Sequence, residues 1–290
     1  MRRKLIIVSL SVLLILPAMS QAQTDVSLFF KKGDQKQLEF VESSSGNLFS
    51  KLGHHGPAIE NPWYGLRMYF DKKTAIDVYS KAQQRLELKE KQWYPSKKEQ
   101  GEGWGADYYK VGKTVGLGGV KLWDKGQIIN LHPVTNRTAR VRNYGDSASM
   151  EMISEGISYR GDYVDISVQV TVYANHRMAK VQASCLSGET VQFVTGINCF
   201  DKLKVVKTEQ YIATWGIHPE DVAAEKVEVG AAIFIPSGYR FETQKLENQY
   251  ILISDQRQDI TFQITSANKR EAEINSMEDF LDLFDKLVEE

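Results

Sequence analysis

Residues 164–172 read Val-Asp-Ile-Ser-Val-Gln-Val-Thr-Val, an unbroken alternation of apolar and polar side chains. Successive side chains of a β-strand point to opposite faces, so this stretch suits a sheet that is covered on one side. Similar runs recur along the chain between turn signals such as Gly145-Asp146, Arg160-Gly161-Asp162 and Ser187-Gly188. The pattern predicts an all-β protein, built as a large antiparallel β-sandwich or barrel.

One helix is predicted at the C-terminus. Ser276 fits an N-cap, and Asp279 follows three positions later. Apolar side chains then recur at helical spacing, at Met277, Phe280, Leu281, Phe284, Leu287 and Val288. We expect this amphipathic helix to seal one end of the sandwich.

The N-terminus has the layout of a secretory signal peptide. Arg2-Arg3-Lys4 is basic, residues 5–16 are apolar, and Ser20-Gln21-Ala22 offers small residues for cleavage. The apolar run is shorter than the ~20 residues that a membrane-spanning helix needs. We therefore predict a signal peptide at residues 1–22, a single β-sandwich domain at residues 23–290, no membrane span after cleavage, and a periplasmic or secreted location.

Charge and cysteine content narrow the partners. The chain has 36 Lys and Arg against 37 Asp and Glu, without a basic block, which argues against nucleic acid. Cys185 and Cys199 are compatible with a disulfide or with two buried thiols, and the sequence leaves both open. The five histidines never show metal-protease spacing. We nominate no metal ligands and no cofactor, and the sequence leaves open whether a metal is bound.

Candidate functional residues gather first around His54 and His55. Glu60 follows within ten positions, and the predicted strand after it places Arg67 and Tyr69 on one face. Arg can neutralise a carboxylate, whereas His and Tyr can move a proton. The alternative is a hydrated loop that leads into a sheet, with Arg67 in a plain ion pair.

A second group of candidates lies at the end of a long predicted loop, residues 90–106, and directly after it. Trp104 offers a flat face for a sugar ring, and Asp107 can accept hydrogen bonds from hydroxyl groups. The alternative for Trp104 is a loop residue that caps the core. Gly116, Gly118 and Gly119 lie in a segment predicted as strand, where they permit a bulge or a close approach of backbone.

Three further candidates are scattered along the chain. His132 precedes a predicted strand from which Arg140 and Arg142 point to the same side, within reach of an anionic ligand. The favoured alternative is that these arginines pair with nearby acids such as Glu151. His218 ends a strand and is placed either at the rim of a cleft or in a loop with its hydrogen bonds satisfied.

Four short motifs resemble a known family. They are His54-His55-Gly56-Pro57, the segments 67–72 and 75–79, and the segment 104–112. The order resembles a family of secreted bacterial proteins described as a domain of unknown function, whose members accompany genes for polysaccharide utilisation, including pectin-type ones. The resemblance covers residue 48 to the C-terminus, implies a β-sandwich of the galactose-mutarotase kind, and implies a carbohydrate partner without a defined reaction.

These observations favour an exported carbohydrate-active protein that acts on or binds uronic-acid-containing oligosaccharides. In a lyase, Arg67 or Arg140 would hold the carboxylate while His55 or Tyr69 transfers a proton. The candidate catalytic residues are His54, His55, Glu60, Tyr69 and Asp107, and the candidate substrate-binding residues are Arg67, Trp104, His132, Arg140 and His218.

The sequence leaves other functions open. A glycoside hydrolase would need two carboxyl groups ~5–10 Å apart, for which Glu60 and Asp107 are the candidates. A mutarotase-like enzyme would use His55 as acid and Glu60 as base. A non-catalytic sugar-binding protein needs the aromatic platforms alone, and a structural envelope protein that docks through the C-terminal helix ranks lowest.

Overall fold

A computed structural model describes residues 24–92, 94–219 and 223–288 of the chain. The predicted signal peptide, residues 1–22, lies outside the described residues. Within the described part, the strands form three sheets in which all paired strands run antiparallel. This architecture confirms the predicted all-β antiparallel sandwich with a C-terminal helix.

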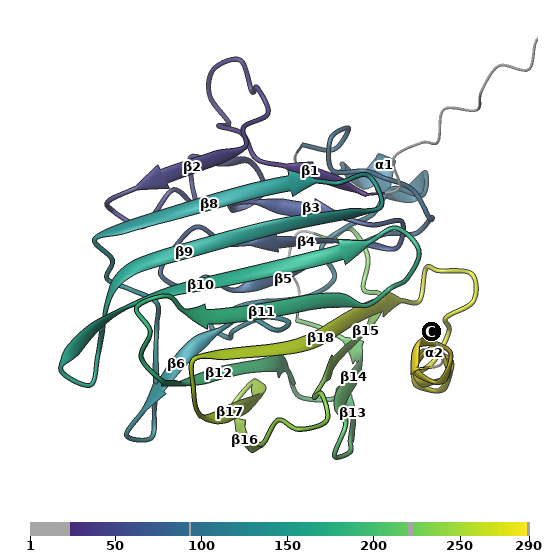
Figure 1. Ribbon diagram of the computed structural model, residues 1–290. Helices are drawn as coiled ribbons and strands as arrows, with labels where there is room; N and C mark the ends of the chain where they lie inside the picture. Colours follow the sequence, from purple (N-terminus) through teal and green to yellow (C-terminus); the bar gives the residue numbers. More distant parts are fainter. Residues whose placement is uncertain (1–23, 93, 220–222, 289–290) are drawn as a thin grey trace, which may run out of the picture.

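The largest sheet has nine strands over the described residues and fills the front of the molecule (Figure 1). In spatial order its strands are β13 (Lys204–Lys207), β14 (Tyr211–Ile217), β15 (Glu228–Phe234), β18 (Asp259–Asn268), β11 (Ala179–Cys185), β10 (Asp162–Tyr173), β9 (Ser147–Tyr159), β8 (Asn136–Asn143) and β2 (Phe40–Ser43). The alternating stretch at residues 164–172 lies in β10, at the middle of this sheet.

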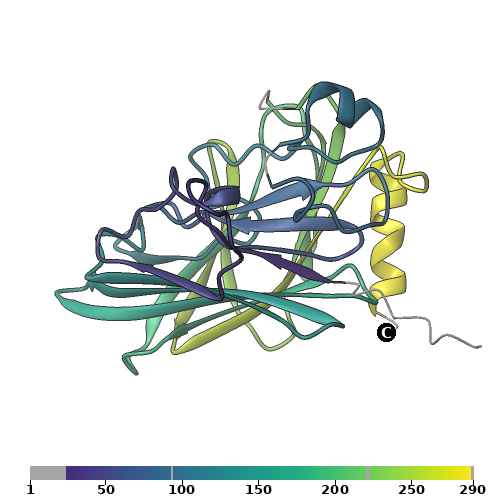
Figure 2. The ribbon, with the colours of Figure 1, turned by 90° about the horizontal axis from the view of Figure 1, so that it is seen from above.

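Two smaller sheets lie behind the large one. The four-stranded sheet has the order β1 (Asp25–Ser27), β3 (Ala58–Glu60), β4 (Tyr64–Met68) and β5 (Ile76–Ser80). The five-stranded sheet has the order β16 (Phe241–Leu246), β17 (Gln249–Arg257), β12 (Val191–Asn198), β6 (Lys121–Asp124) and β7 (Gln127–Ile129). Viewed from above, the four-stranded sheet forms a second layer over the large sheet (Figure 2).

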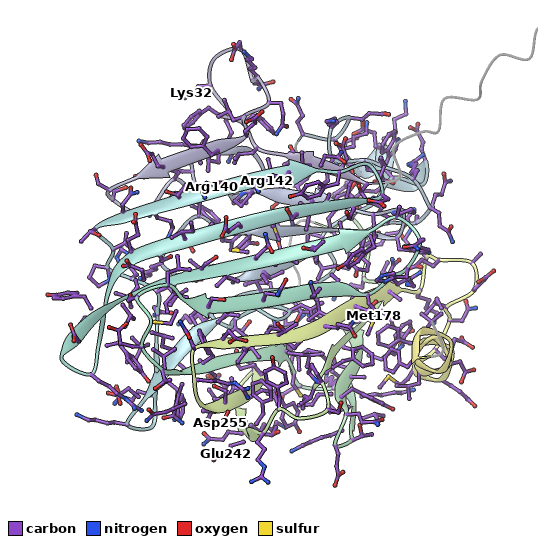
Figure 3. The ribbon with its side chains drawn as sticks, viewed as in Figure 1. Lys32, Arg140, Arg142, Met178, Glu242 and Asp255 are labelled. Carbon is purple, nitrogen blue, oxygen red and sulfur yellow. The ribbon has the colours of Figure 1, made fainter. Side chains whose placement is uncertain are left out.

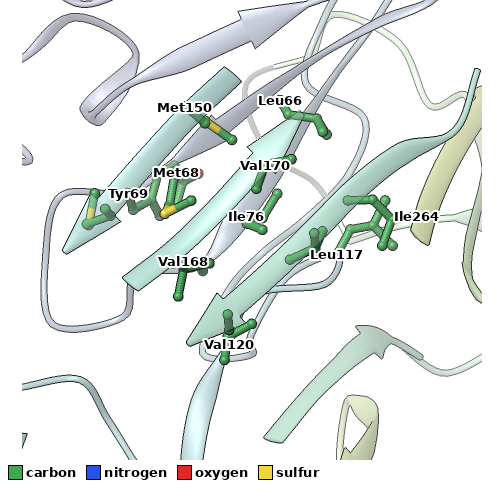
Figure 4. Close-up of a cluster of buried hydrophobic side chains, with 14 of the residues drawn as sticks. Leu66, Met68, Tyr69, Ile76, Leu117, Val120, Met150, Val168, Val170 and Ile264 are labelled. Carbon is green, nitrogen blue, oxygen red and sulfur yellow. The ribbon is translucent and has the colours of Figure 1, made fainter. Parts of the chain in front are cut away.

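The main core lies between these layers. Leu66 and Met68 of β4 and Ile76 of β5 are fully buried, and so are Met150 of β9 and Val170 of β10 (Figure 4). Buried residues alternate with less buried ones along β11, as the sequence pattern predicts. In β4 and β5 every residue is buried, so the outward face of these strands is covered as well.

The C-terminal helix forms as predicted. α2 (Met277–Val288) begins after Ser276, whose hydroxyl accepts a hydrogen bond from the Asp279 N–H at 3.1 Å. Phe280 and Phe284 are buried against Trp215 and Phe234 of the large sheet. The helix stands at the edge of the sandwich (Figures 1 and 2).

The loop at residues 90–106 contains a short helix that the sequence analysis missed. α1 (Lys97–Gly101) starts from a capping box, in which the Ser96 hydroxyl accepts from the Glu99 N–H and the Glu99 carboxylate accepts from the Ser96 N–H. The Ser-x-x-Glu spacing is the sequence signal for such a start. A separate 3₁₀ turn, η1 (Gly53–His55), contains the two histidines of the predicted site.

The prediction that Gly116, Gly118 and Gly119 lie in a strand was wrong. The chain there is irregular, and the strand begins at Lys121. Gly116 has a φ of +76°, and a Cβ at this position would lie 1.9 Å from the carbonyl oxygen of Ile76. The glycines thus permit the close approach of backbone that we predicted, but they lie outside any regular β-strand.

Candidate functional site

The outward face of β4 and β5 carries a buried ionic network. The Arg67 guanidinium donates to the Asp77 carboxylate at 2.5 Å and also to the Asp107 carboxylate. The Tyr69 hydroxyl donates to the same Asp77 oxygen at 2.6 Å. Burial alone would lower the pKa of Arg67, but Asp107 and Asp77 outweigh it and raise that pKa, so the guanidinium stays charged.

The hairpin between β4 and β5 sets this geometry. The Asp71 carboxylate accepts hydrogen bonds from the N–H groups of Lys73 and Thr74, which fixes a tight turn. With the turn at this position, Arg67 lies directly opposite Asp77 in the ladder. Cross-strand neighbours on one face of an antiparallel pair are in side-chain contact, so the ion pair follows from the register.

His54 and Tyr94 lie over the guanidinium. The Tyr94 ring centre is 5.3 Å from the central carbon of Arg67, and the Tyr94 side chain hydrogen-bonds Asp107. His54 is 4% exposed, and burial lowers its pKa to about 3, so the imidazole is neutral at physiological pH. The void that His54 lines here with Arg67 measures about 10 Å³, which is the space of one water.

His55 lies beside Tyr69 at the same corner. Its ring stacks on Phe49 at 3.9 Å between centroids, and its Nδ1 lies 3.1 Å from the Phe49 carbonyl oxygen. The Tyr69 ring meets it edge-on at 5.8 Å. Burial lowers the pKa of His55, and the loop places it where the sequence analysis expected a polar corner.

Glu60 holds in place the loop at residues 87–106, called the covering loop below. Its carboxylate accepts from the N–H groups of Glu87 and Leu88 and pairs with the Lys81 ammonium group. Glu60 and Lys81 are almost fully buried. Protein groups thus occupy the acceptor positions of the Glu60 carboxylate, so Glu60 anchors residues 87–88. Glu60 is not part of the Arg67–Asp107 pair.

Trp104 belongs to the covering loop. The Arg85 guanidinium stands 3.9 Å and the Lys91 ammonium 4.0 Å from the centre of its rings. Cations at these distances interact with the aromatic face. The half-buried Trp104 therefore serves the packing of the loop, in line with the capping alternative.

Beyond Asp107 the protein opens into a cavity of about 260 Å³. Its lining residues are Lys97, Asp107, Tyr108, Ile217, His218, Pro219, Ala223, Ala224, Glu225, Lys226 and Val227. They come from α1, from the irregular segment after the covering loop, and from the connection between β14 and β15. Asp107 thus touches both the ionic network and an accessible space.

His218 is buried in the wall of this cavity. Its Nδ1 accepts a hydrogen bond from the Lys110 N–H at 3.2 Å, and its ring packs against Tyr109. Burial lowers the pKa of His218 to about 3. A neutral imidazole that accepts at Nδ1 carries its proton on Nε2. Among the described residues, that Nε2–H has no hydrogen-bond partner.

Two candidates lie elsewhere. Arg140 is on the outward face of the large sheet, 3.8 Å from Glu151, so the predicted pairing is present. Because Arg67 points away from the other layer, Arg140 and Tyr69 are on opposite sides of the sandwich and do not form one site. His132 is exposed in the connection between β7 and β8.

Asp77 and Tyr94 belong to the network but were not nominated from the sequence, and neither was Lys81, the partner of Glu60. Asp77 had a usable signal, since pairing β4 with the next strand across the turn at Asp71 places it opposite Arg67. Tyr94 had no sequence signal of this kind, because its position over Arg67 depends on how the covering loop folds back.

Among the described residues, no group of three or more His, Cys, Asp or Glu is placed to hold a metal ion. Cys185 and Cys199 are both buried free thiols, which answers the open question about the disulfide. A search of the same residues finds no helix long and apolar enough to cross a membrane.

The fold and this site define an all-β sandwich with a buried ionic network beneath a folded loop. The chain belongs to the family described as "Domain of unknown function (DUF4861)", whose model matches residues 16–290. This membership confirms that the family is a domain of unknown function, as expected. No curated protein matches the chain.

One solved structure with a partial likeness is the crystal structure of 4-alpha-glucanotransferase from Thermococcus litoralis. The TM-score is 0.36 at 10% sequence identity, and the match covers 73% of this chain and 37% of that one. The chain thus spans little more than a third of that enzyme. A likeness of this size carries no conclusion about function.

Proposed function

We propose that this protein is an exported carbohydrate-binding protein that holds a uronic-acid-containing oligosaccharide in the cavity between Asp107 and His218. The observation that carries the proposal is the composition of the cavity wall. It joins a buried carboxylate, a neutral histidine with an unpartnered N–H, and the aromatic side chain of Tyr108.

This combination suits a polyhydroxylated ring. Sugar hydroxyl groups both donate and accept, so they match the carboxylate of Asp107. The Nε2 of His218 is closed to solvent in the unliganded protein, so a bound sugar must shift the cavity wall to accept from its N–H. The Tyr108 ring, with Ile217 and Val227, adds apolar surface for the C–H faces of the sugar. Lys97 lies at the exposed side of the same cavity and supplies a positive charge for a uronate carboxylate.

The electrostatics favour binding over β-elimination. Arg67 was the candidate for holding the substrate carboxylate, but its guanidinium already binds Asp77 and Asp107 and is 2% exposed. A histidine with a pKa of about 3, such as His218, acts as a hydrogen-bond donor and is a weak base at neutral pH. We therefore place binding first.

The test is a titration of the purified mature chain with oligogalacturonides and with neutral oligosaccharides, followed by calorimetry. His218→Phe keeps the ring packed against Tyr109, and it removes the Nε2–H donor together with the Nδ1 acceptor of the Lys110 N–H. One lost hydrogen bond lowers affinity by about 3–10-fold. His132→Phe is the matched control, since His132 is exposed elsewhere, and it leaves affinity unchanged.

Three results would count against the proposal. The wild-type chain binds none of the glycans, or His218→Phe binds as tightly as wild type, or the mixture develops the absorbance of unsaturated uronides or new reducing ends. The last result would replace binding with catalysis, as a lyase or a hydrolase respectively. Export is tested separately, by N-terminal sequencing of the protein recovered from its native host.

A further inference from the structure

The outward face of the large sheet is built from polar side chains that lie in register across the strands. One row runs from β8 to β18 and consists of Arg140, Glu151, Gln169, Gln182 and Thr261, each paired with the next. Neighbouring strands are about 4.8 Å apart, so the row offers a hydrogen-bonding group at each such interval. This face looks away from the ionic network of β4 and β5 (Figures 1 and 2).

At one edge of this face the row ends at Arg140, and Arg142 lies beside it on the same strand. Arg140 and Arg142 are two positions apart on β8 and project to the same side (Figure 3). β2 pairs with β8 only as far as Arg140, and a hollow of about 450 Å³ lies where that pairing ends. Both arginines line it.

Two exposed aromatic side chains line the same hollow. Phe40 of β2 is 58% exposed and pairs with Arg140 in the ladder, while Tyr144 follows the end of β8 and is 59% exposed. Exposed apolar surface marks an interaction site when it gathers in one place, as these two rings do around one hollow. Here they stand on either side of the arginines.

The arginine charges are largely uncommitted. Arg140 is 46% exposed and its Nη1 lies 3.8 Å from Glu151, a geometry that contributes little. The side chain of Arg142 makes no ion pair or hydrogen bond to any residue that the structure describes. Glu39 also lines the hollow and carries the opposing charge.

We propose that Phe40, Arg140, Arg142 and Tyr144 form a second glycan-binding surface, which holds a polysaccharide that carries carboxylate groups. The planar guanidinium groups bind carboxylates in a two-pronged geometry. The aromatic rings pack on the apolar faces of the sugar units, and the chain continues along the polar row toward β11. This site is independent of the Asp107–His218 cavity, which takes a short oligosaccharide on the other side of the sandwich.

The test is affinity electrophoresis of the mature chain in gels that contain polygalacturonate or a neutral polysaccharide. Arg140→Ala/Arg142→Ala removes both guanidinium groups and weakens retardation by polygalacturonate about tenfold, because each exposed charge contact supplies a modest part of the affinity. Phe40→Ala weakens it as well. Retardation of wild type also declines with added salt, as expected for exposed charges.

Arg240→Ala/Lys207→Ala is the matched control, since it removes the same charge from exposed positions outside this surface. The proposal is overturned if this control and the Arg140/Arg142 variant lose retardation equally, or if neither loses any. It is also overturned if sedimentation shows a dimer that the Arg140/Arg142 variant converts to a monomer, which would make this face a contact between two copies. His218→Phe leaves retardation unchanged, so failure of the cavity proposal remains distinguishable.

Discussion

At the scale of single residues, the protein buries positive charges under very different conditions. Arg67 is balanced by two carboxylates. Arg137 is satisfied by the Ser154 hydroxyl and by backbone carbonyl oxygens, among them that of Gly46. Lys121 is 2% exposed and donates to the Thr74 hydroxyl at 2.8 Å, while the nearby Arg137 adds a like charge. Lys121 is therefore the least compensated of the three.

This difference predicts a stabilising substitution, Lys121→Met. Burial, with Arg137 second, lowers the pKa of Lys121 from 10.5 to about 7, so the folded state disfavours the charged form. Methionine keeps most of the volume and removes the amine. We expect the free energy of unfolding at pH 7 to rise by about 1–4 kcal/mol, the range seen when buried charged groups are replaced by apolar ones.

The pH dependence gives a second readout of the same group. Between pH 7 and pH 10.5 the unfolded chain binds the Lys121 proton more tightly than the folded one, so wild-type stability rises with pH in this window. Urea unfolding at several pH values should show a flatter slope for Lys121→Met. Lys207→Met, at an exposed position, is the control. A less stable Lys121→Met with an unchanged slope would contradict this account.

At the scale of elements, the C-terminal helix and the covering loop show how local signals and packing combine. The cap at Ser276 and the apolar spacing are local, and both appear as the sequence predicts. What the helix covers is decided by the sheet. Gly230 leaves room under Phe280, since a Cβ there would lie 2.8 Å from the ring.

The docking of α2 depends chiefly on Phe280. The side chain is fully buried, and its ring lies 6.0 Å from Trp215 and 5.0 Å from Phe284. Phe280→Ala should lower the free energy of unfolding by about 3–5 kcal/mol, since it removes a buried aromatic ring and leaves a cavity. The measurement is urea unfolding followed by circular dichroism. Asp282→Ala, on the exposed side of the helix, is the control, and equal stability of the two variants would refute the prediction.

At the scale of the whole molecule, the sandwich separates two polar surfaces. The network around Arg67 lies on the outside of the four-stranded sheet, and Arg140 with Arg142 lies on the outside of the large sheet. Both layers turn their apolar residues inward, so the polar faces necessarily point in opposite directions. The two glycan sites that we propose would likewise lie apart, so the proposals predict that two glycan segments bind at once.

The two buried histidines couple the whole fold to acid. The pKa values of His54 and His218 are about 3 in the folded state against 6.5 ordinarily, with burial as the main cause. Below pH 6.5 the unfolded chain therefore binds more protons than the folded one, and stability falls as the pH falls toward 3. Across this window, each histidine lowers the free energy of unfolding by on the order of a few kcal/mol.

The substitution that tests this coupling is His54→Gln/His218→Gln, compared with wild type by thermal unfolding between pH 7 and pH 4. The double variant should lose less stability on acidification, because glutamine has no proton to gain. His132→Gln, at an exposed position, serves as control. If the double variant and wild type follow the same acid curve, other groups control the acid response.

Much of the local structure was determined by the sequence itself. Alternation with a period of two specified the strands, their inward faces and the shared face of Arg67 and Tyr69, because neighbouring side chains of a strand must point to opposite sides. The helix start at Ser276 and the turn at Asp71 were equally local. These features depend on residues only a few positions apart.

The tertiary structure alone decided what meets at the site. Lys110 and His218 are 108 positions apart, and no spacing rule brings that histidine to the cavity beside Asp107. The same holds for Arg140, which shares a strand pattern with Arg67 yet belongs to the other layer. Strand pairing and loop folding join distant segments through burial of apolar surface, which is non-directional and leaves no short-range mark in the chain.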